Sequence, residues 1–202
     1  GFALVSALIA VGCAETPDDV FVRATNGDAE AQVVLGDQFL EPGEARSLAA
    51  AADWYERAAT QGNQLAQFKL GQLHFGESDG AFEPKPATGV RWLSDAAELG
   101  NEEAMRDLIA IHDEGRGIPK DPEISGKWMV KVAEFEKPAD LVALGIRYYE
   151  AKGVPLNRGR GAKLIARAAE LGDATAQLYL ARLYTTQGNG VVGNLEVAVR
   201  WF

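Results

Sequence analysis

The chain has 202 residues, of which 47% are hydrophobic and 24% charged, a composition that favours a folded protein with a large core over a disordered one. Its formal net charge of −9 at pH 7 repels phosphate backbones, so we expect no nucleic-acid partner. The single cysteine, Cys13, has no second cysteine to pair with, which excludes a disulfide-stapled secreted scaffold.

The first thirteen residues form an uncharged apolar run that is shorter than the ~20 residues a membrane-spanning helix needs. The run is typical of the hydrophobic part of a signal peptide. Ala10-Val11-Gly12-Cys13 resembles a bacterial lipobox, whose cysteine is lipidated and becomes the first residue of the mature protein. A plain secretory signal and an apolar first helix are the alternatives.

Two further features concern the ends of the chain. Ala14 follows the cysteine where an inner-membrane lipoprotein would favour Asp, so we expect a lipid anchor on the periplasmic face of the bacterial outer membrane. The sequence opens without Met and stops at Phe202 inside an amphipathic pattern, so we expect a fragment at both ends.

An internal repeat dominates the rest of the chain. One phrase, clearest as Ala66-Gln67-Phe68-Lys69-Leu70-Gly71, begins at residues 31, 66, 104, 140 and 176. A second phrase, clearest as Trp54-Tyr55-Glu56-Arg57-Ala58-Ala59, recurs at 92, 128 and 164. Both have apolar residues at helical spacing, and a period of 20–50 residues indicates stacked repeats. Each repeat therefore contains two amphipathic helices, A and B.

Turn and cap residues set the helix limits. A Gly followed by Asp or Asn precedes most A helices, as in Gly62-Asn63, whereas Lys137-Pro138 takes this place in the fourth repeat. We predict A helices at 29–40, 64–75, 102–114, 138–150 and 174–186, and B helices at 48–60, 86–99, 122–135, 158–171 and from 195. The chain then divides into a signal-peptide remnant with a lipobox (1–13), a short linker (14–23) and a repeat array (24–202).

The repeat pattern, with its Leu-Gly-x-x-Tyr phrase, Gly-rich turn, Lys-Trp and Ala-Ala, resembles the Sel1-like repeat family, most closely at Gly115–Asp121 and Lys127-Trp128. The resemblance implies an all-α, right-handed α-solenoid of about five repeats, the last truncated. It also implies a scaffold or adaptor for protein partners in the bacterial cell envelope, such as an envelope secretion or exopolysaccharide export complex. A cysteine-rich branch of the family is linked to β-lactam binding, and this chain departs from it because its repeats contain no cysteine.

Small residues inside the helices predict close packing. Gly36, Gly71 and Gly145 interrupt A helices, where each glycine costs ~1 kcal/mol relative to alanine. We therefore expect another helix to cross close to each of them. The Trp and Tyr residues at helical spacing are interpreted as core side chains between repeats.

A catalytic site is not predicted. His74 and His112 each follow the first repeat phrase by the same interval, in a slot that Phe39, Tyr148 and Tyr184 occupy elsewhere, so they are interpreted as substitutes for a structural aromatic residue. Neither belongs to a metal-binding or nucleophile motif. We expect no catalytic, metal or cofactor residues; the alternative is a periplasmic enzyme, or a cell-wall or β-lactam-binding hydrolase, built on the same repeats.

The partner-binding face is predicted from the related tetratricopeptide fold, in which A helices line the concave surface. That alignment selects positions two, six and nine residues after the start of each repeat. The candidate partner-binding residues are Phe68, Gln72, Phe75, Arg106, Asp113, Ile146, Tyr149 and Arg182. We expect Phe68, Phe75, Ile146 and Tyr149 to be exposed anchors for a peptide or helix. The alternative is that superhelical packing, or chain beyond residue 202, buries them.

Overall fold

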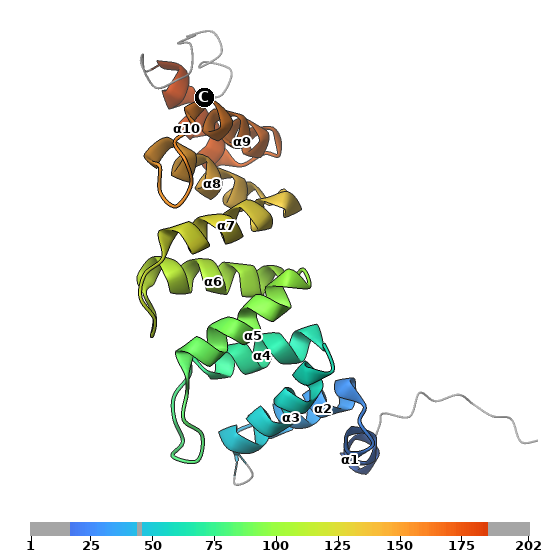
Figure 1. Ribbon diagram of the computed structural model, residues 1–202. Helices are drawn as coiled ribbons and strands as arrows, with labels where there is room; N and C mark the ends of the chain where they lie inside the picture. Colours follow the sequence, from blue (N-terminus) through green and yellow to red (C-terminus); the bar gives the residue numbers. More distant parts are fainter. Residues whose placement is uncertain (1–16, 44–45, 186–202) are drawn as a thin grey trace, which may run out of the picture.

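The computed structural model describes residues 17–43 and 46–185, and within these ranges the chain is helical without any strand (Figure 1). The α-helices in order are α1 (Pro17–Thr25), α2 (Ala29–Gln38), α3 (Leu48–Thr60), α4 (Gln64–Leu73), α5 (Pro86–Glu98), α6 (Glu102–Glu114), α7 (Pro122–Val132), α8 (Pro138–Glu150), α9 (Arg158–Glu170) and α10 (Ala174–Thr185). A short 3-10 helix, η1 (Ala133–Phe135), continues α7.

The predicted helix pairs are confirmed. Helices α2, α4, α6, α8 and α10 are the A helices, and α3, α5, α7 and α9 are the B helices. The largest boundary difference is in the third B helix, which was expected to run to residue 135 but ends as an α-helix at Val132. The predicted B helix from 195 and the predicted signal peptide at 1–13 lie outside the described residues.

The capping residues act as the sequence predicts. Asp28, Asn63, Asn101 and Asp173 each accept a hydrogen bond from the backbone N–H three residues later, at 2.7–3.0 Å. Each follows a glycine with positive φ, which ends the preceding helix, for example Gly100 at φ 90°. The fourth repeat lacks such a glycine, and there Glu136 adopts φ 52° after η1. The junction between α7 and α8 is therefore built differently from the others.

The two helices of a repeat cross at the glycines that the sequence singled out. A Cβ atom on Gly71 of α4 would lie 2.7 Å from Cγ of Leu93 on α5, and one on Gly145 of α8 would lie 2.6 Å from Cγ1 of Ile165 on α9. Both partner side chains are fully buried. The prediction of close helix crossings is thus confirmed, and these crossings let Leu93 and Ile165 form the centre of the core.

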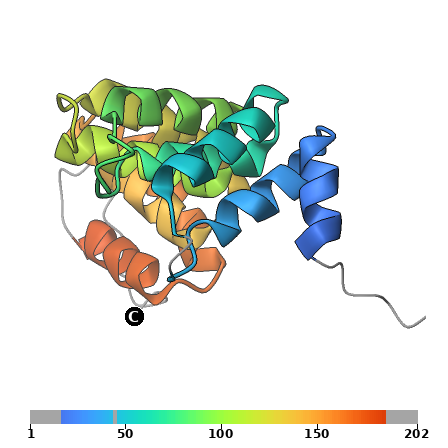
Figure 2. The same cartoon turned by 90° about the horizontal axis from the view of Figure 1, so that it is seen from below.

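Helix α1 corrects the predicted linker at 14–23. Residues 17–25 are helical, and Val20 and Ala24 pack into a buried cluster with Ala31 and Leu35 of α2. The helix was missed because its apolar pattern spans little more than two turns. In Figure 2 it stands to the side of the stacked pairs, so it covers the N-terminal end of the array.

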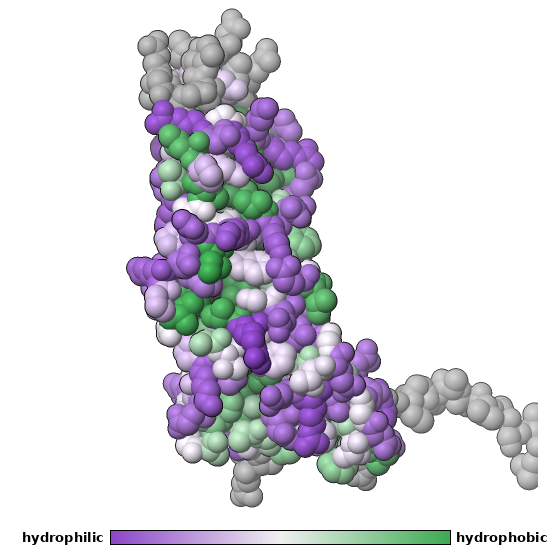
Figure 3. Space-filling view, in the orientation of Figure 1, coloured by the Kyte–Doolittle hydropathy of each residue, from purple (hydrophilic) through white to green (hydrophobic). Residues whose placement is uncertain are grey.

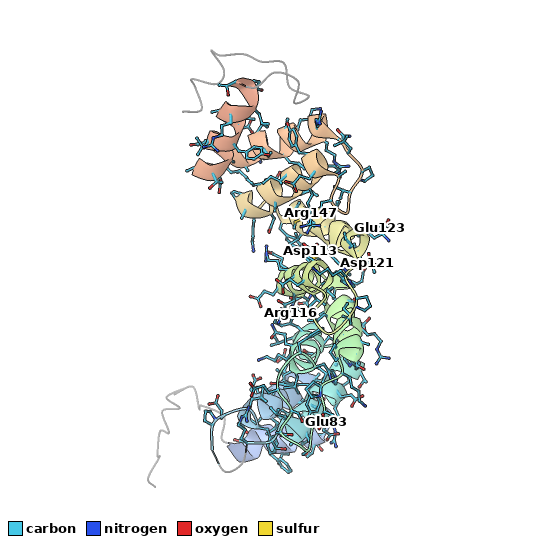
Figure 4. The ribbon with its side chains drawn as sticks, turned by 90° about the vertical axis from the view of Figure 1, so that its left-hand side faces the viewer. Glu83, Asp113, Arg116, Asp121, Glu123 and Arg147 are labelled. Carbon is cyan, nitrogen blue, oxygen red and sulfur yellow. The ribbon has the colours of Figure 1, made fainter. Side chains whose placement is uncertain are left out.

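The array has two long faces and two edges. The A helices form one face, called here the A-helix face, and the B helices form the B-helix face. In Figure 4 the array is gently curved, and the A-helix face is its concave side. The B-to-A turns lie along one edge and the A-to-B turns along the other (Figure 1). No helix in the described ranges is long and apolar enough to cross a membrane.

Candidate functional site: the A-helix face

The predicted aromatic anchors are more buried than expected. Phe68 is only 7% exposed and belongs to the core cluster that joins the second and third repeats, so the expectation that it is an exposed anchor is wrong. Phe75, Ile146 and Tyr149 are half-buried and pack against the same cluster. The reason is that the repeats pack closely enough for each A helix to cover part of its neighbour.

Tyr149 illustrates this packing. Its ring lies 6.4 Å from that of Tyr179 on α10, centroid to centroid. Burial raises the pKa of its hydroxyl group, and the hydroxyl oxygen has no hydrogen-bond partner among the described residues. Tyr149 is therefore a packing residue between the fourth and fifth repeats.

Polar side chains on the A-helix face join successive A helices. Lys69 Nζ on α4 lies 2.8 Å from Asp37 Oδ1 on α2. Gln72 Nε2 on α4 donates to Asp107 Oδ2 on α6 at 2.9 Å. The candidate Arg106 on α6 donates through Nη2 to Asp140 Oδ2 on α8 at 2.7 Å. Each of these bonds joins residues about one repeat apart in the chain, and we call the series the polar ladder.

The third and fourth repeats share a buried ion pair. The candidate Asp113 on α6 pairs with Arg147 on α8, and Arg147 Nη2 also donates to Ser125 Oγ on α7 at 3.0 Å (Figure 4). The Arg147 side chain is 8% exposed and that of Asp113 21%. The carboxylate of Asp113 therefore bonds to the next repeat and joins the two repeats. The eighth candidate, Arg182 on α10, is exposed.

Two adjoining cavities open on this face around Gln72 and Gly76, and we call them together the A-face hollow. The larger, about 500 Å³, lies between the first and second repeats, and the smaller, about 210 Å³, lies between the second and third. The larger is lined by Leu40, Arg46, Leu48, Tyr55, Lys69, Gln72, Leu73, Gly76 and Glu77. The smaller is lined by Gln72, Phe75, Gly76, Leu93, Asp107, Ile111 and Arg116. Of the candidates, Gln72 thus lines both cavities and Phe75 lines the smaller one.

The polar part of the wall of the hollow is bonded internally. The Tyr55 hydroxyl donates to Asp37 Oδ1 at 2.5 Å, and the same oxygen accepts from Lys69. Burial, followed by the bond to Asp37, raises the pKa of Tyr55 far above its usual value. Tyr55 therefore remains a neutral donor at physiological pH, and Asp37 is held in place from two sides.

Both histidine side chains are buried, and burial favours their neutral form. His74 stacks on Phe82 at 5.1 Å between ring centroids, and its Nδ1 accepts from the Lys85 backbone N–H at 3.2 Å. Burial lowers the pKa of His74 and of His112 below the usual value. The surroundings fit the interpretation that they replace a structural aromatic side chain. Within the described residues no three His, Cys, Asp or Glu side chains are grouped as a metal site.

Two more cavities flank α7 on the B-helix face. One, of about 610 Å³, lies between α5 and α7, and the other, of about 630 Å³, lies between α7 and the turn after α8. They share Lys127 and Val130 of α7. Each of these cavities is larger than either cavity of the A-face hollow taken singly, but sequence reasoning did not select them.

The inter-repeat bonds were also missed, although the sequence carries a signal for them. Arg106 and Asp140, like Asp113 and Arg147, are separated by 34 residues, close to one repeat length. Opposite charges at that interval on A helices indicate an inter-repeat ion pair in a solenoid, as opposite charges four apart do within a helix.

The geometry and a family match together define the class of protein. Five copies of the Sel1 repeat match residues 29–63, 64–101, 103–134, 139–173 and 174–202. Stacked helix pairs with this period make the chain an α-solenoid repeat protein. The chain belongs to the Sel1 repeat family. Sel1 repeat proteins generally bind protein partners and are in general non-catalytic scaffolds.

Two solved structures show the same architecture. The first is c5321 of uropathogenic Escherichia coli, a protective antigen displaying an SLR fold, with 28% sequence identity and a TM-score of 0.70; the match covers 93% of this chain and 40% of that one. The second is a Sel1 repeat protein from Oxalobacter formigenes, with 26% identity and a TM-score of 0.67, covering 93% of this chain and 74% of that one. The chain thus spans 40% of the length of c5321.

Proposed function

We propose that this protein is an adaptor whose protein partner binds in the A-face hollow. The observation that carries the proposal is the meeting of two cavities at Gln72 and Gly76, on the face where successive A helices are held in register by the polar ladder. A hollow in a rigid frame lets a partner bind without first ordering the site, which lowers the entropic cost of binding.

The lining determines what kind of segment fits. Leu40, Leu48 and Leu73 offer apolar surface to one anchoring side chain in the larger cavity. Gln72 is exposed and Arg116 lines the smaller cavity, so hydrogen-bonding groups lie beside the apolar surface. An apolar pocket flanked by polar groups is suited to a peptide that inserts a side chain and bonds through its backbone.

Filling the hollow tests this proposal. Gln72→Trp adds bulk at the point the two cavities share, on an exposed residue, so folding should be retained. The matched control is Lys163→Trp, on an exposed residue of α9 at the other face. We expect the first variant to lose partner co-purification while the control keeps it. Gln72→Trp also removes the exposed hydrogen bond to Asp107, which should lower its melting temperature only slightly. Equal partner recovery with both variants would place the binding site elsewhere.

A pair of alanine variants separates binding from packing. Phe75 lines the smaller cavity, whereas Tyr149 packs against Tyr179. Phe75 also packs against the core, so binding is compared per folded molecule, and Phe75→Ala should weaken it by ~2 kcal/mol or more, as truncating an aromatic hot spot does. Tyr149→Ala should lower the melting temperature, with partner recovery proportional to the folded fraction. Binding loss in both variants without destabilisation would extend the site to the fourth repeat.

We also propose that the adaptor acts in the bacterial envelope, tethered through Cys13. The support is the resemblance of Ala10-Val11-Gly12-Cys13 to a lipobox. Tethering would raise the local concentration of the adaptor for partners in a secretion or exopolysaccharide export complex. Membrane-associated protein labelled with palmitate is the expected result, and Cys13→Ser should abolish both properties. Label retained after that substitution would refute lipidation at Cys13.

A further inference from the structure

Three exposed apolar side chains occupy equivalent positions in successive repeats on the edge formed by the B-to-A turns. Leu99 is 54% exposed, Phe135 42% and Leu171 42%. Each lies two residues before the residue that caps the next A helix (Asn101, Lys137 and Asp173), and we call the three side chains the edge row. In Figure 3 apolar surface appears along the right-hand margin, where the turns that follow α5 and α7 lie.

The turns that carry the row are bonded to one another. Lys131 Nζ lies 2.6 Å from Glu98 Oε2, beside Leu99, and Arg167 Nη2 lies 3.0 Å from Glu136 Oε2, beside Phe135. Lys137 pairs with Glu102 across the same two turns as the first pair. Each bond joins one repeat to the next, so the spacing of the edge row is fixed by the array.

Acidic charge is in excess along this edge. The cations Lys131, Lys137 and Arg167 are all engaged with carboxylates of a neighbouring repeat. Glu103 and Glu134 are exposed, and neither forms an ion pair within the described part of the chain. The edge therefore combines an ordered apolar row with unneutralised carboxylates.

We propose that the edge row is a second docking surface, whose occupant is a basic amphipathic helix of a partner protein lying along the array. Charge complementarity argues for this occupant: the excess acid attracts Lys and Arg but repels a second copy of a chain whose net charge is −9. The same charge repels an anionic membrane surface.

The spacing fits a helix. Ion pairs of Lys131 with Glu98 and of Lys137 with Glu102 join the turns that carry Leu99 and Phe135, so these two side chains lie one repeat apart, on the order of 10 Å, as neighbouring helices in a packed layer do. Residues seven positions apart on an α-helix are separated by about 10.5 Å along its axis. A helix with one apolar side chain in every two turns thus matches the edge row, and its lysines reach Glu103 and Glu134.

A synthetic probe tests the proposal on the 202-residue chain. The probe is a labelled helical peptide of about three heptads, with one Leu per heptad, Ala at the other buried positions and Lys on both flanks; a matched peptide carries Glu in place of Lys. Fluorescence anisotropy should show binding of the Lys peptide that weakens with salt, and no binding of the Glu peptide. Failure of the Lys peptide to bind at low salt would overturn the proposal.

Variants locate the binding. The triple variant Leu99→Ser, Phe135→Ser, Leu171→Ser should weaken peptide binding at least about tenfold, while Leu156→Ser, on a 58% exposed leucine of the opposite edge, should change it less than about twofold. Glu103→Gln with Glu134→Gln should weaken it about three- to tenfold. Gln72→Trp should leave it unchanged, which separates this surface from the A-face hollow.

Two further outcomes would overturn the edge as a docking surface for basic helices. One is peptide binding that the triple variant leaves intact while the circular dichroism spectrum shows that the variant is folded. The other is self-association of the wild-type chain in sedimentation that the triple variant abolishes, since the occupant would then be a second copy.

Discussion

Arg147 gives the sharpest prediction of stability. It stands where the second, third and fifth repeats hold Leu73, Ile111 and Leu183 and the first holds Gln38, so the fourth repeat carries a buried cation where the other repeats carry uncharged side chains. Its Nη1 has no hydrogen-bond partner in the described ranges, nor does Oδ1 of Asp113, the carboxylate with which it pairs. The pair is thus desolvated without all its bonds being satisfied.

Removing one partner should cost more than removing both. Asp113→Ala strands a guanidinium group that is 8% exposed, so we expect a loss of about 3–5 kcal/mol. Arg147→Leu leaves a carboxylate that is 21% exposed and can be hydrated, so its cost should be smaller, about 1–2 kcal/mol. The double variant Asp113→Leu, Arg147→Leu restores side chains that other repeats carry at these positions, and it should equal or exceed wild-type stability.

Thermal unfolding followed by circular dichroism measures these differences. For a chain of this size 1 kcal/mol corresponds to about 2–4 °C, so Asp113→Ala should melt about 6–20 °C below wild type, and the double variant should melt at or above it. A double variant as unstable as Asp113→Ala, or an Asp113→Ala variant as stable as wild type, would refute the reasoning.

Three further predictions concern packing and pH. Gly71→Leu should lower stability by about 1–3 kcal/mol or more, because Leu93 occupies the space of the new side chain, whereas Gly159→Ala, with only Asn157 Oδ1 at 3.8 Å, should be neutral in the same melt. Lys137 holds the pKa of Glu102 below its usual 4.5. This pair therefore stabilises the fold above about pH 4.5, and the stabilisation is lost as the pH falls through the lowered pKa. Glu102→Gln should reduce the decrease in melting temperature that wild type shows over this acidic range. Burial lowers the pKa of His112 from 6.5, so the unfolded chain takes up a proton at a higher pH than the folded chain and stability falls as the pH drops below about 6.5. His112→Tyr should reduce the fall in melting temperature measured between about pH 7.5 and 5.5. An unaltered profile would mean that protonation of His112 is not linked to unfolding.

The sequence predicts local structure well because each repeat carries its own boundary signals. Asn63 and Asn101 cap the helices expected after them, and Gly71 marks a crossing that follows from the absence of a side chain. These properties depend on residues close in sequence or on the helical period. The end of α7 was less well placed, because Glu136 adopts a positive φ without being glycine.

The candidate site was harder to predict because exposure depends on how far one repeat covers the next. Phe68 lies on the predicted inner face of its helix, but the third repeat packs over it. Arg106 has the position of a binding residue, yet it is engaged with Asp140 and Glu102. Only the three-dimensional stagger of the helices distinguishes a side chain that faces a partner from one that faces the neighbouring repeat.

Amide hydrogen exchange on the complex tests the adaptor account most directly. With the partner purified on the wild-type chain, the account predicts added protection at the C-terminal half of α4 and in α6, around Gln72, Phe75 and Asp107, and none in α9. Protection confined to α5 and α7, which border the cavities of the B-helix face, would contradict binding in the A-face hollow.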